Sequence, residues 1–288
     1  MIRCASCGIA ECTACKFVRY CSVKCQREHR PKHKKACKKR AAELRDELLF
    51  KQPESSHRGD CPICCLPLSL DNSKSVMMAC CSKSICHGCA YANLIRQREV
   101  SLKSTCPFCR HPAPTSQAEA DMNTMKRAEV NDPVALREVG IYRCHDGDYK
   151  SALEYLSKAA ELGDAGAHYE LSVMYPKGEG VENDEKKEVY HLEQAAIGGH
   201  PFARHNLGCD EEDNGRHERA VKHYIIGANL GNDRSLVALK DYFTRGLVSK
   251  EDFATALRAH QAAIDATKSP QREAASTKEA IKQITGGR

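Results

Sequence analysis

Closely spaced cysteine pairs dominate the N-terminal part of this chain. Of its 18 cysteines, 16 fall within the first 109 residues. Five pairs have two residues between their members: Cys4/Cys7, Cys12/Cys15, Cys61/Cys64, Cys86/Cys89 and Cys106/Cys109. Two thiolates at this spacing fit on one tight turn and fill two positions of a tetrahedral zinc ion. The pattern therefore predicts structural zinc sites, around which much of this part of the chain would fold.

Composition favours small zinc modules and helices. The chain has 288 residues, of which 41% are hydrophobic and 6% aromatic, without any Trp; this suits Ala-rich helices better than a large β core. No run approaches the roughly 18 apolar residues of a membrane span, and the N-terminus has no signal-peptide pattern. We expect a cytoplasmic and/or nuclear protein with no membrane partner, in which these cysteines bind metal rather than form disulfides.

The first module contains enough ligands for two zinc ions. Its candidate ligands are Cys4, Cys7, Cys12, Cys15, Cys21, Cys25, His33 and Cys37. We expect an interleaved pairing, because ligands distant in sequence tie a short chain together more effectively. One site would use Cys4, Cys7, Cys21 and Cys25, and the other Cys12, Cys15, His33 and Cys37. The last two lie four residues apart, so they share one face of a helix.

These ligands, with Tyr20 before Cys21 and the run Cys21-Ser-Val-Lys-Cys25, resemble a MYND finger, a family of protein-interaction zinc modules. Two features depart from the family pattern. The spacer between Cys7 and Cys12 is only four residues long, and Arg30 stands where the family commonly has Trp. The resemblance implies that this module recruits protein partners.

Basic residues crowd the end of this module. They are Lys32, Lys34, Lys35, Lys38, Lys39 and Arg40, and residues 1–59 hold 15 Lys/Arg against 6 Asp/Glu. One interpretation is a nucleic-acid or nuclear-localisation patch. We favour a solvated helix face that offsets the nearby thiolate charge, because no aromatic residues interleave the cluster to stack bases. Nucleic acid is therefore not an expected partner.

A second group of ligands lies in residues 60–112. It comprises Cys61, Cys64, Cys80, Cys81, Cys86, Cys89, Cys106 and Cys109. The segment resembles an all-cysteine RING finger, which implies one site from Cys61, Cys64, Cys86 and Cys89. The other would combine Cys106, Cys109 and Cys81 with Cys80 or, alternatively, His87. Lys83 occupies the position of the usual RING histidine, and Cys65 is expected to be a spare thiol. Both modules together would bind up to four Zn²⁺.

The RING resemblance also implies a partner. The zinc ions of such a finger are coordinatively closed, so the module itself performs no covalent chemistry. In the family it binds a ubiquitin-conjugating enzyme, and the corresponding residues here are Ile63, Leu94 or Ile95, Pro107 and Arg110. The alternative is that Ile63 and Pro107 are only turn residues of the zinc knuckles. Whether the chain is an enzyme stays open, because the motif alone does not demonstrate ligase activity.

The second half of the chain contains a helical repeat. The segment Ala159–Leu171 recurs as Ala195–Leu207 and Gly227–Leu239, and a degenerate copy begins at Asn131, at steps of 32, 36 and 32 residues. The pattern resembles the Sel-one-like repeat, a relative of the tetratricopeptide repeat. It implies stacked pairs of antiparallel helices whose groove binds peptides or proteins. Gly163, Gly199 and Gly231 would turn the chain between units, and Asp184 would cap a helix.

We do not expect the histidines and cysteines of these repeats to bind metal. The histidines His145, His168, His191, His205, His217 and His223 lack paired spacing with other ligands, so we expect them at the surface. Cys144 and Cys209 should pack as small apolar side chains. The sequence has no Walker loop, no GxSxG elbow and no HExxH motif.

Together these patterns predict a mostly α protein with two small zinc-stabilised modules followed by a repeat solenoid. The expected domains are a MYND-like finger (1–40), a helix and flexible linker (41–59), a RING-like finger (60–112), a linker and helix (113–130), Sel-one-like repeats (131–268) and a flexible tail (269–288). We expect a zinc-binding protein-interaction protein. Three hypotheses follow: a RING-type ubiquitin ligase, a non-enzymatic adaptor and, with less support, a nucleic-acid-associated regulator.

Overall fold

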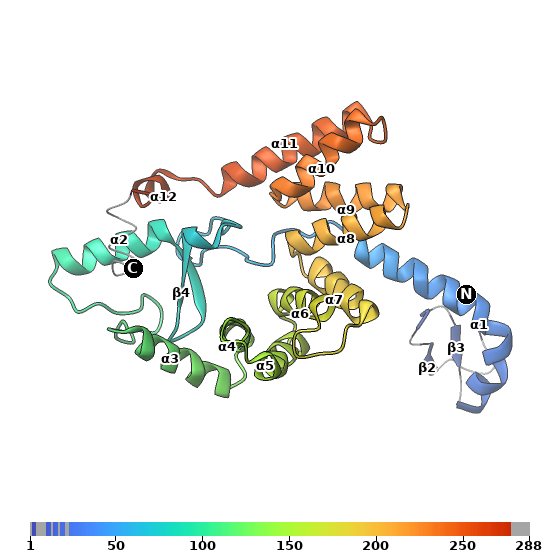
Figure 1. Ribbon diagram of the computed structural model, residues 1–288, viewed down its shortest axis with the longest axis horizontal. Helices are drawn as coiled ribbons and strands as arrows, with labels where there is room; N and C mark the ends of the chain where they lie inside the picture. The colour runs from blue at the N-terminus through green and yellow to red at the C-terminus, as the bar shows by residue number, and fades with distance from the viewer. Residues whose placement is uncertain (1, 4–9, 13, 17, 21–22, 278–288) are drawn as a thin grey trace. The chain divides into compact units, whose positions relative to one another are not determined.

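A computed structural model describes residues 2–3, 10–12, 14–16, 18–20 and 23–277 (Figure 1). The chain divides into two compact units, Met1–Gln52 and Pro53–Arg288. Most of the described residues are helical, as the composition predicts. Across these residues, no helix combines the length and the apolar character that crossing a membrane requires.

The first unit combines three short strands with one long helix. Strand β3 (Val18–Tyr20) lies between β1 (Ile2–Arg3), to which it is parallel, and β2 (Ala10–Glu11), to which it is antiparallel. Helix α1 follows as Val23–Leu49. Its Lys, Arg, Glu and Ala residues are good helix formers, and the helix predicted to begin at Ala41 is the continuation of α1.

The second unit begins with a small cysteine-rich module. A single 3₁₀ turn, η1 (Asn72–Lys74), precedes an antiparallel hairpin of β4 (Ser75–Met78) and β5 (Lys83–Cys86). Helix α2 (His87–Glu99) follows directly. The buried core of this module consists of Cys61, Leu68, Ile85, Cys86 and Cys89. Such a core is too small to fold a module by hydrophobic burial alone, so thiolate chemistry must contribute.

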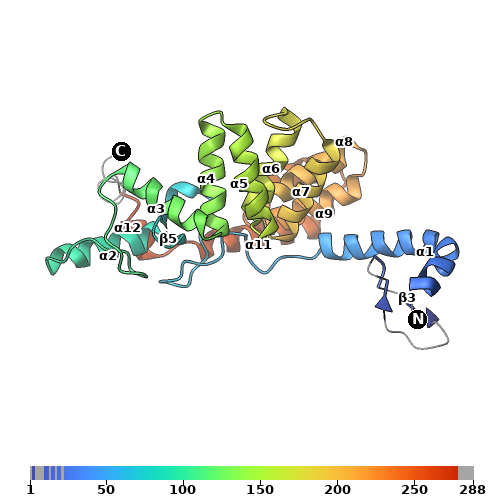
Figure 2. The same ribbon diagram turned by 90° about the horizontal axis from the view of Figure 1, so that it is seen from below.

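Helices form the rest of the second unit, and in Figure 2 α4 to α9 lie side by side. Their bounds are α3 Gln117–Glu129, α4 Pro133–His145, α5 Tyr149–Glu161, α6 Ala165–Lys177, α7 Glu185–Ile197, α8 Pro201–Asp213, α9 His217–Asn229, α10 Asp233–Thr244 and α11 Lys250–Ala266. Each helix from α3 to α10 packs against the next one along the chain. This nearest-neighbour packing is the arrangement that a repeat stack requires.

The turns between repeats have one shared geometry. Each contains a left-handed residue, namely Asn131, Gly163, Gly199 and Gly231, with φ of 61°, 88°, 80° and 85°. The next side chain accepts a hydrogen bond from the backbone N–H three residues further on; these caps are Asp132, Asp164, His200 and Asn232. Capping of this kind satisfies N–H groups that a helix start leaves unpaired. Asp184 caps α7 in the same way, as expected.

Small residues let the helices approach closely. A Cβ added to Gly140 would lie 2.7 Å from Cγ of Leu156, and one added to Gly208 would lie 2.3 Å from a ring carbon of Tyr224. Both facing side chains are fully buried. Cys144 and Cys209 pack against the two core clusters of the stack, in agreement with the sequence-based expectation.

Two segments differ from the expected flexible joints. In the linker, the N–H of His57 donates to the carbonyl of Gly199 at 2.9 Å, and its ring lies 4.0 Å from that of His200. The missing side chain of Gly199 leaves space for the carbonyl of Ser55, which would lie 2.7 Å from an added Cβ. The linker therefore docks on the stack, because buried ring packing and a backbone hydrogen bond hold it there.

The C-terminal segment is the second difference. We expected a flexible tail over residues 269–288, but α12 (Pro270–Ala274) is helical and packs against α2. The side chain of Arg272 fixes it through hydrogen bonds to the zinc module. The remaining part of the expected tail, 278–288, lies outside the described residues.

The histidines of the repeats are less exposed than expected. His145 is exposed, whereas His168, His191, His205 and His217 are half-buried. His223 is fully buried, so the expectation of a surface position is wrong for this residue. Its ring lies inside the helical stack, where burial lowers its pKa to about 3 because the charged form would lose its hydration.

Candidate metal centres

One group of ligands lies in the first unit. Cys12, Cys15, His33 and Cys37 place their ligand atoms within 4.8 Å of one another. The sulfurs of Cys12 and Cys37 are 3.7 Å apart, and Cys15 Sγ lies 3.3 Å from His33 Nε2. Two thiolates on one tetrahedral zinc ion lie about 3.8 Å apart, given Zn–S bonds of about 2.3 Å. The group therefore has the dimensions and the soft donors of a zinc site.

Local backbone structure positions these four ligands. The N–H of Lys16 donates to the carbonyl of Cys12 at 2.8 Å, and Lys16 has a left-handed φ of 50°. This tight turn brings the first two sulfurs together. His33 and Cys37 follow one turn apart on α1.

The charges of this group also favour a bound cation. Burial, followed by the neighbouring thiols Cys12 and Cys15, raises the pKa of Cys37 to about 12. For Cys12, burial opposes ionisation, but hydrogen bonds from the Cys15 backbone and the His33 ring lower its pKa to about 6. Several thiolates so close together repel each other, and a bound Zn²⁺ offsets that repulsion.

The other expected site of this module cannot be compared in the same way. Cys4, Cys7 and Cys21, together with the side chain of Cys25, lie outside the described residues.

A second group of ligands opens the second unit. Cys61, Cys64, Cys86 and Cys89 converge within 4.8 Å, and the sulfurs of Cys64 and Cys86 are 3.8 Å apart. Backbone N–H groups point at two of the sulfurs: that of Cys86 donates to Cys61 Sγ and that of Cys89 to Cys86 Sγ, each at 3.4 Å. Such donors stabilise thiolates. We refer to these four residues as the Cys61 group.

Cys64 of the Cys61 group has an additional partner. Its pKa is affected first by burial, which raises it. The backbone N–H of Leu66 and the guanidinium of Arg272 both hydrogen-bond the sulfur and together lower its pKa to about 7. Arg272 Nη2 lies 3.3 Å from the sulfur. The sequence separation of 208 residues explains why no spacing argument points to this contact.

A third group, which we call the Cys80 group, consists of Cys80, Cys81, Cys106 and Cys109. Cys81 and Cys106 have their sulfurs 3.8 Å apart, and those of Cys80 and Cys109 are 3.3 Å apart. His87 was the alternative fourth ligand, but among the described residues the structure gathers Cys80 into this group and not His87. The donors of both groups fit zinc, because all eight are thiols and the four sulfurs of each group lie within 4.8 Å of one another.

The hairpin turn explains how adjacent cysteines can serve one ion. Cys80 and Cys81 lie in the turn between β4 and β5, and the carbonyl of Met78 accepts N–H bonds from both Cys81 (3.0 Å) and Ser82 (2.8 Å). Ser82 has a left-handed φ of 56°. This irregular turn lets two successive side chains contribute to the same group, which the usual alternation of a strand would prevent.

The two groups interleave along the chain. Cys61/Cys64 join Cys86/Cys89, while Cys80/Cys81, which lie between these pairs in sequence, join Cys106/Cys109. One ion would tie residues 61–64 to the start of α2, and the other would tie the hairpin turn to residues 106–109. Occupancy of both sites would fix the hairpin and α2 in one arrangement.

The zinc module of the second unit contains two turns that we call the first knuckle (residues 61–67) and the second knuckle (residues 106–112). Both repeat the turn that Cys12 and Lys16 form in the first unit. Cys65 N–H donates to Cys61 O at 2.8 Å, and Arg110 N–H donates to Cys106 O at 3.0 Å. Both donors have left-handed φ, 55° and 58°. Cys65 is exposed and belongs to neither group, as expected of a spare thiol. Cys65 and Arg110 therefore occupy equivalent positions, directly after the second cysteine of each knuckle.

The residues implied in partner binding occupy two kinds of surface. Ile63, with 43% of its surface exposed, and Arg110 project from the two knuckles. Leu94 and Pro107 line a hollow of about 1190 Å³, which Tyr142 of α4 also lines. Ile95 is half-buried on α2 and is not among the residues that line this hollow. Between the two alternatives on α2, Leu94 thus lines this hollow and Ile95 does not.

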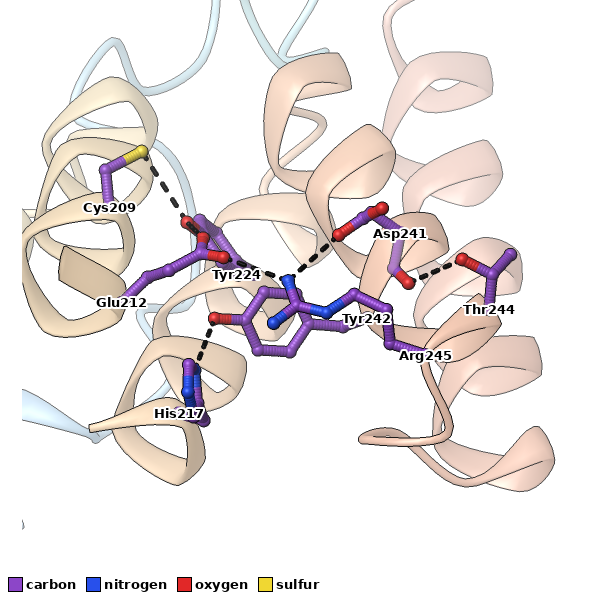
Figure 3. A network of polar contacts seen from close by, with 8 residues as sticks. All are labelled: Cys209, Glu212, His217, Tyr224, Asp241, Tyr242, Thr244 and Arg245. Atoms are coloured by element: carbon purple, nitrogen blue, oxygen red, sulfur yellow. Dashed lines mark hydrogen bonds and ion pairs between the residues drawn. The ribbon is translucent and has the colours of Figure 1, made fainter. Parts of the chain in front are cut away.

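A polar network joins the last helices of the stack (Figure 3). Tyr224 donates to Glu212 at 3.0 Å, and Arg245 donates to both Glu212 and Asp241 at 3.1 Å. His217 Nδ1 lies 3.1 Å from the hydroxyl of Tyr242. Burial, followed by the nearby Glu212, raises the pKa of Tyr242 to about 12. Because these groups satisfy one another, the network ties α8, α9 and α10 together rather than forming a reactive centre.

Comparison with known protein families identifies two of the three parts. The MYND finger family matches residues 2–37, and the Sel1 repeat family matches residues 133–164, 165–200 and 201–232. The chain therefore contains a MYND finger and three Sel1 repeats, as their sequence patterns predict. The lengths of these repeats agree with the unequal steps seen in the sequence. No curated protein matches the chain.

Solved structures of repeat proteins are also similar. A Sel1 repeat protein from Oxalobacter formigenes is 21% identical, with 62% of this chain and 52% of that chain covered, at a TM-score of 0.46. A protective antigen of uropathogenic Escherichia coli strains, which displays an SLR fold, is 19% identical, with coverages of 70% and 48% and a TM-score of 0.44. The chain spans about half the length of these two proteins.

The comparisons and the geometry agree on the parts of the chain. It combines a MYND zinc finger, further cysteine groups compatible with Zn²⁺ and three Sel1 repeats.

Proposed function

We propose that this protein is a RING-type ubiquitin ligase, which recruits a ubiquitin-conjugating enzyme through residues 60–112 and selects its substrate through the Sel1 repeats. The interleaving of the Cys61 and Cys80 groups carries this proposal. Two closed four-thiolate sites that brace one hairpin and one helix leave no coordination position for a substrate. A module of this kind acts by holding a partner in position.

The surface around the two groups supports an enzyme-binding role. Ile63 is an exposed apolar side chain on the first knuckle. Arg110 places a cation on the second knuckle, next to the last ligand, Cys109. Apolar anchors surrounded by polar groups are typical of the centre of protein interfaces.

The repeats supply the second binding function. Tyr142 of α4 is 54% exposed and lines the same hollow as Leu94 and Pro107 of the zinc module. A ligand in that hollow would contact both parts of the second unit. We therefore propose that recruitment and substrate selection occur on adjoining surfaces, and that the protein works in the cytoplasm or nucleus, where thiolates stay reduced.

The test is autoubiquitination of the full chain with a panel of ubiquitin-conjugating enzymes. We expect ubiquitin chains with at least one enzyme of the panel and a loss of about tenfold or more for Ile63→Ala, because interface anchors contribute at least this much. The matched control is Leu257→Ala, a 46% exposed leucine on α11. It should leave activity unchanged.

The alternative is a non-enzymatic adaptor whose zinc modules only hold proteins. The absence of the usual RING histidine at Lys83 and the adjacent Cys80 and Cys81 favour it. Absence of ubiquitin chains with every enzyme of the panel, from protein shown by native mass spectrometry to carry zinc, would establish this alternative instead.

A further inference from the structure

The short helix α12 brings the end of the described chain back to the zinc module. Gln271 Nε2 donates to the carbonyl of Gly88 at 3.1 Å. Gly88 lies between the ligands Cys86 and Cys89 at the start of α2. A Cβ added to it would lie only 3.0 Å from Cα of Arg272. The absence of a side chain at Gly88 thus allows two backbones to approach closely.

Arg272 uses both terminal nitrogens of its guanidinium at this contact. Nη1 donates to the carbonyls of Pro67 (2.6 Å) and Thr267 (2.8 Å), and Nη2 donates to the carbonyl of Leu66 (3.0 Å). The remaining bond from Nη2 goes to Cys64 Sγ at 3.3 Å. Three of these four acceptors belong to the first knuckle. A rigid planar fork suits such an arrangement, whereas a single ammonium does not.

The contact gives the two zinc groups of this module different surroundings. Arg272 adds a positive charge and a donor to one thiolate of the Cys61 group. In the part of the chain that the structure describes, no arginine hydrogen bond to the Cys80 group is recorded. Partners outside the ligand set commonly change metal affinity by about 10- to 100-fold, because they orient the ligand and stabilise its charge.

We propose that α12 is a clasp whose docking is coupled to zinc in the Cys61 group, so that each strengthens the other. Docked Arg272 holds the Cys64 sulfur in position and slows the loss of zinc. Bound zinc in turn fixes the first knuckle, which presents the carbonyls of Leu66 and Pro67 to Arg272. Such coupling is reciprocal by thermodynamic necessity. The consequence is that the end of the repeat stack is attached to the zinc module only while the Cys61 group holds zinc.

This inference requires zinc in the Cys61 group but not ligase activity. The experiment measures thiol exposure rather than ubiquitin transfer, so the two proposals can fail separately. Zinc-loaded full chain is challenged with a chelator in the presence of N-ethylmaleimide. Peptide mass mapping then gives separate labelling rates for the Cys61 and Cys80 groups.

The expected result is selective. Arg272→Gln should accelerate labelling of the Cys61 group by about 10- to 100-fold and leave the Cys80 group unchanged. Arg272→Lys should lie between this variant and the wild type, because it keeps the charge but loses the fork. The control is Arg258→Gln on α11, where the exposed Arg258 donates to Thr255 of the same helix. Equal acceleration of both groups, or none, would overturn the proposal.

The reverse measurement needs no variant. Amide hydrogen exchange of residues 270–277 is followed in the wild type before and after zinc leaves the Cys61 group. Exchange should be slow in the loaded protein and fast after release, while α8 and α9 stay protected. Equal exchange of this segment in both states would show that the clasp and the metal are independent.

Discussion

Two regions of the second unit, the zinc module of residues 60–112 and the repeat stack, are held together by different interactions. The module's buried cluster has five members, and three of them are cysteines. In the stack, the cluster around α4 to α6 contains Ala, Leu, Val, Met and Tyr side chains, all of which it buries by direct helix packing. The module thus depends on metal for cohesion, whereas the stack depends on apolar area and on close helix approach.

Because of this difference, a local change should have different consequences for stability in the two regions. A stack of repeats distributes its stability over neighbouring helix pairs, so local changes stay local. A module with two metal sites has a small apolar core, so its folding depends on bound metal. Three predictions probe this contrast.

Chelation should have the largest effect. Removing zinc from the full chain should unfold residues 60–112, because structural zinc sites contribute about 10–16 kcal/mol to folding. Helices α5 to α9 should keep slow amide exchange, since their contacts are helix to helix. Hydrogen exchange resolved by peptide checks this directly. Loss of protection throughout α5 to α9 would show that the stack depends on the metal and would break the comparison.

A core truncation in the stack should have an intermediate effect. Leu171 of α6 is fully buried, so Leu171→Ala should lower the free energy of unfolding of the stack by about 2–5 kcal/mol. Urea denaturation should show the same loss of stability for Leu171→Ala with and without chelator. Leu257→Ala, at a 46% exposed position, is the control and should change stability by less than about 0.5 kcal/mol. A dependence of the Leu171 effect on zinc would argue against separable cores.

Protonation of His200, at the contact between linker and stack, should have the smallest effect on stability. This effect depends on pH. Burial, followed by the nearby His57 and Arg137, lowers the pKa of His200 to about 2. The unfolded chain binds this proton near the ordinary pKa of 6.5, so the folded state binds fewer protons below that pH. The contribution of His200 is therefore complete above pH 6.5 and is lost as the pH falls. Between pH 7 and pH 5 the loss should be about 2 kcal/mol.

The variant His200→Asn isolates this group. Asparagine retains the helix cap but has no ionisable proton. Urea denaturation at pH 7 and pH 5 should show a smaller loss of stability for the variant than for the wild type. His57, whose pKa burial lowers to about 3, acts in the same direction and is present in both proteins. An identical pH dependence of the two proteins would contradict the assigned burial of His200.

Much of this architecture follows from local sequence. The MYND finger, the Sel1 repeats and the mostly helical fold were all predictable. Their signals, closely spaced cysteine pairs and left-handed glycines, act on only a few neighbouring residues. The interleaved grouping of Cys61 with Cys86, and of Cys81 with Cys106, agrees with the grouping that the RING resemblance implies. The use of His200 as a cap was not predicted, since a histidine at that position carries no general capping signal.

Other features depended on the path of the whole chain. The ring of His57 packs against the ring of His200, and Arg272 hydrogen-bonds Cys64 across 208 residues of sequence. Neither partner carries a local pattern that selects the other. Composition correctly marked both segments as polar, but polarity does not distinguish a mobile segment from one that is docked by a few directed hydrogen bonds.

By itself the sequence determined which residues can bind zinc, where the repeats turn and which helices form, because these properties arise from chemistry within a few residues of chain. Only the tertiary structure decided that Cys80 rather than His87 completes its group, that His223 is buried and that α12 returns to the first knuckle. These outcomes depend on how distant segments pack. The energy of that packing depends on both contacting surfaces, so neither segment specifies it alone.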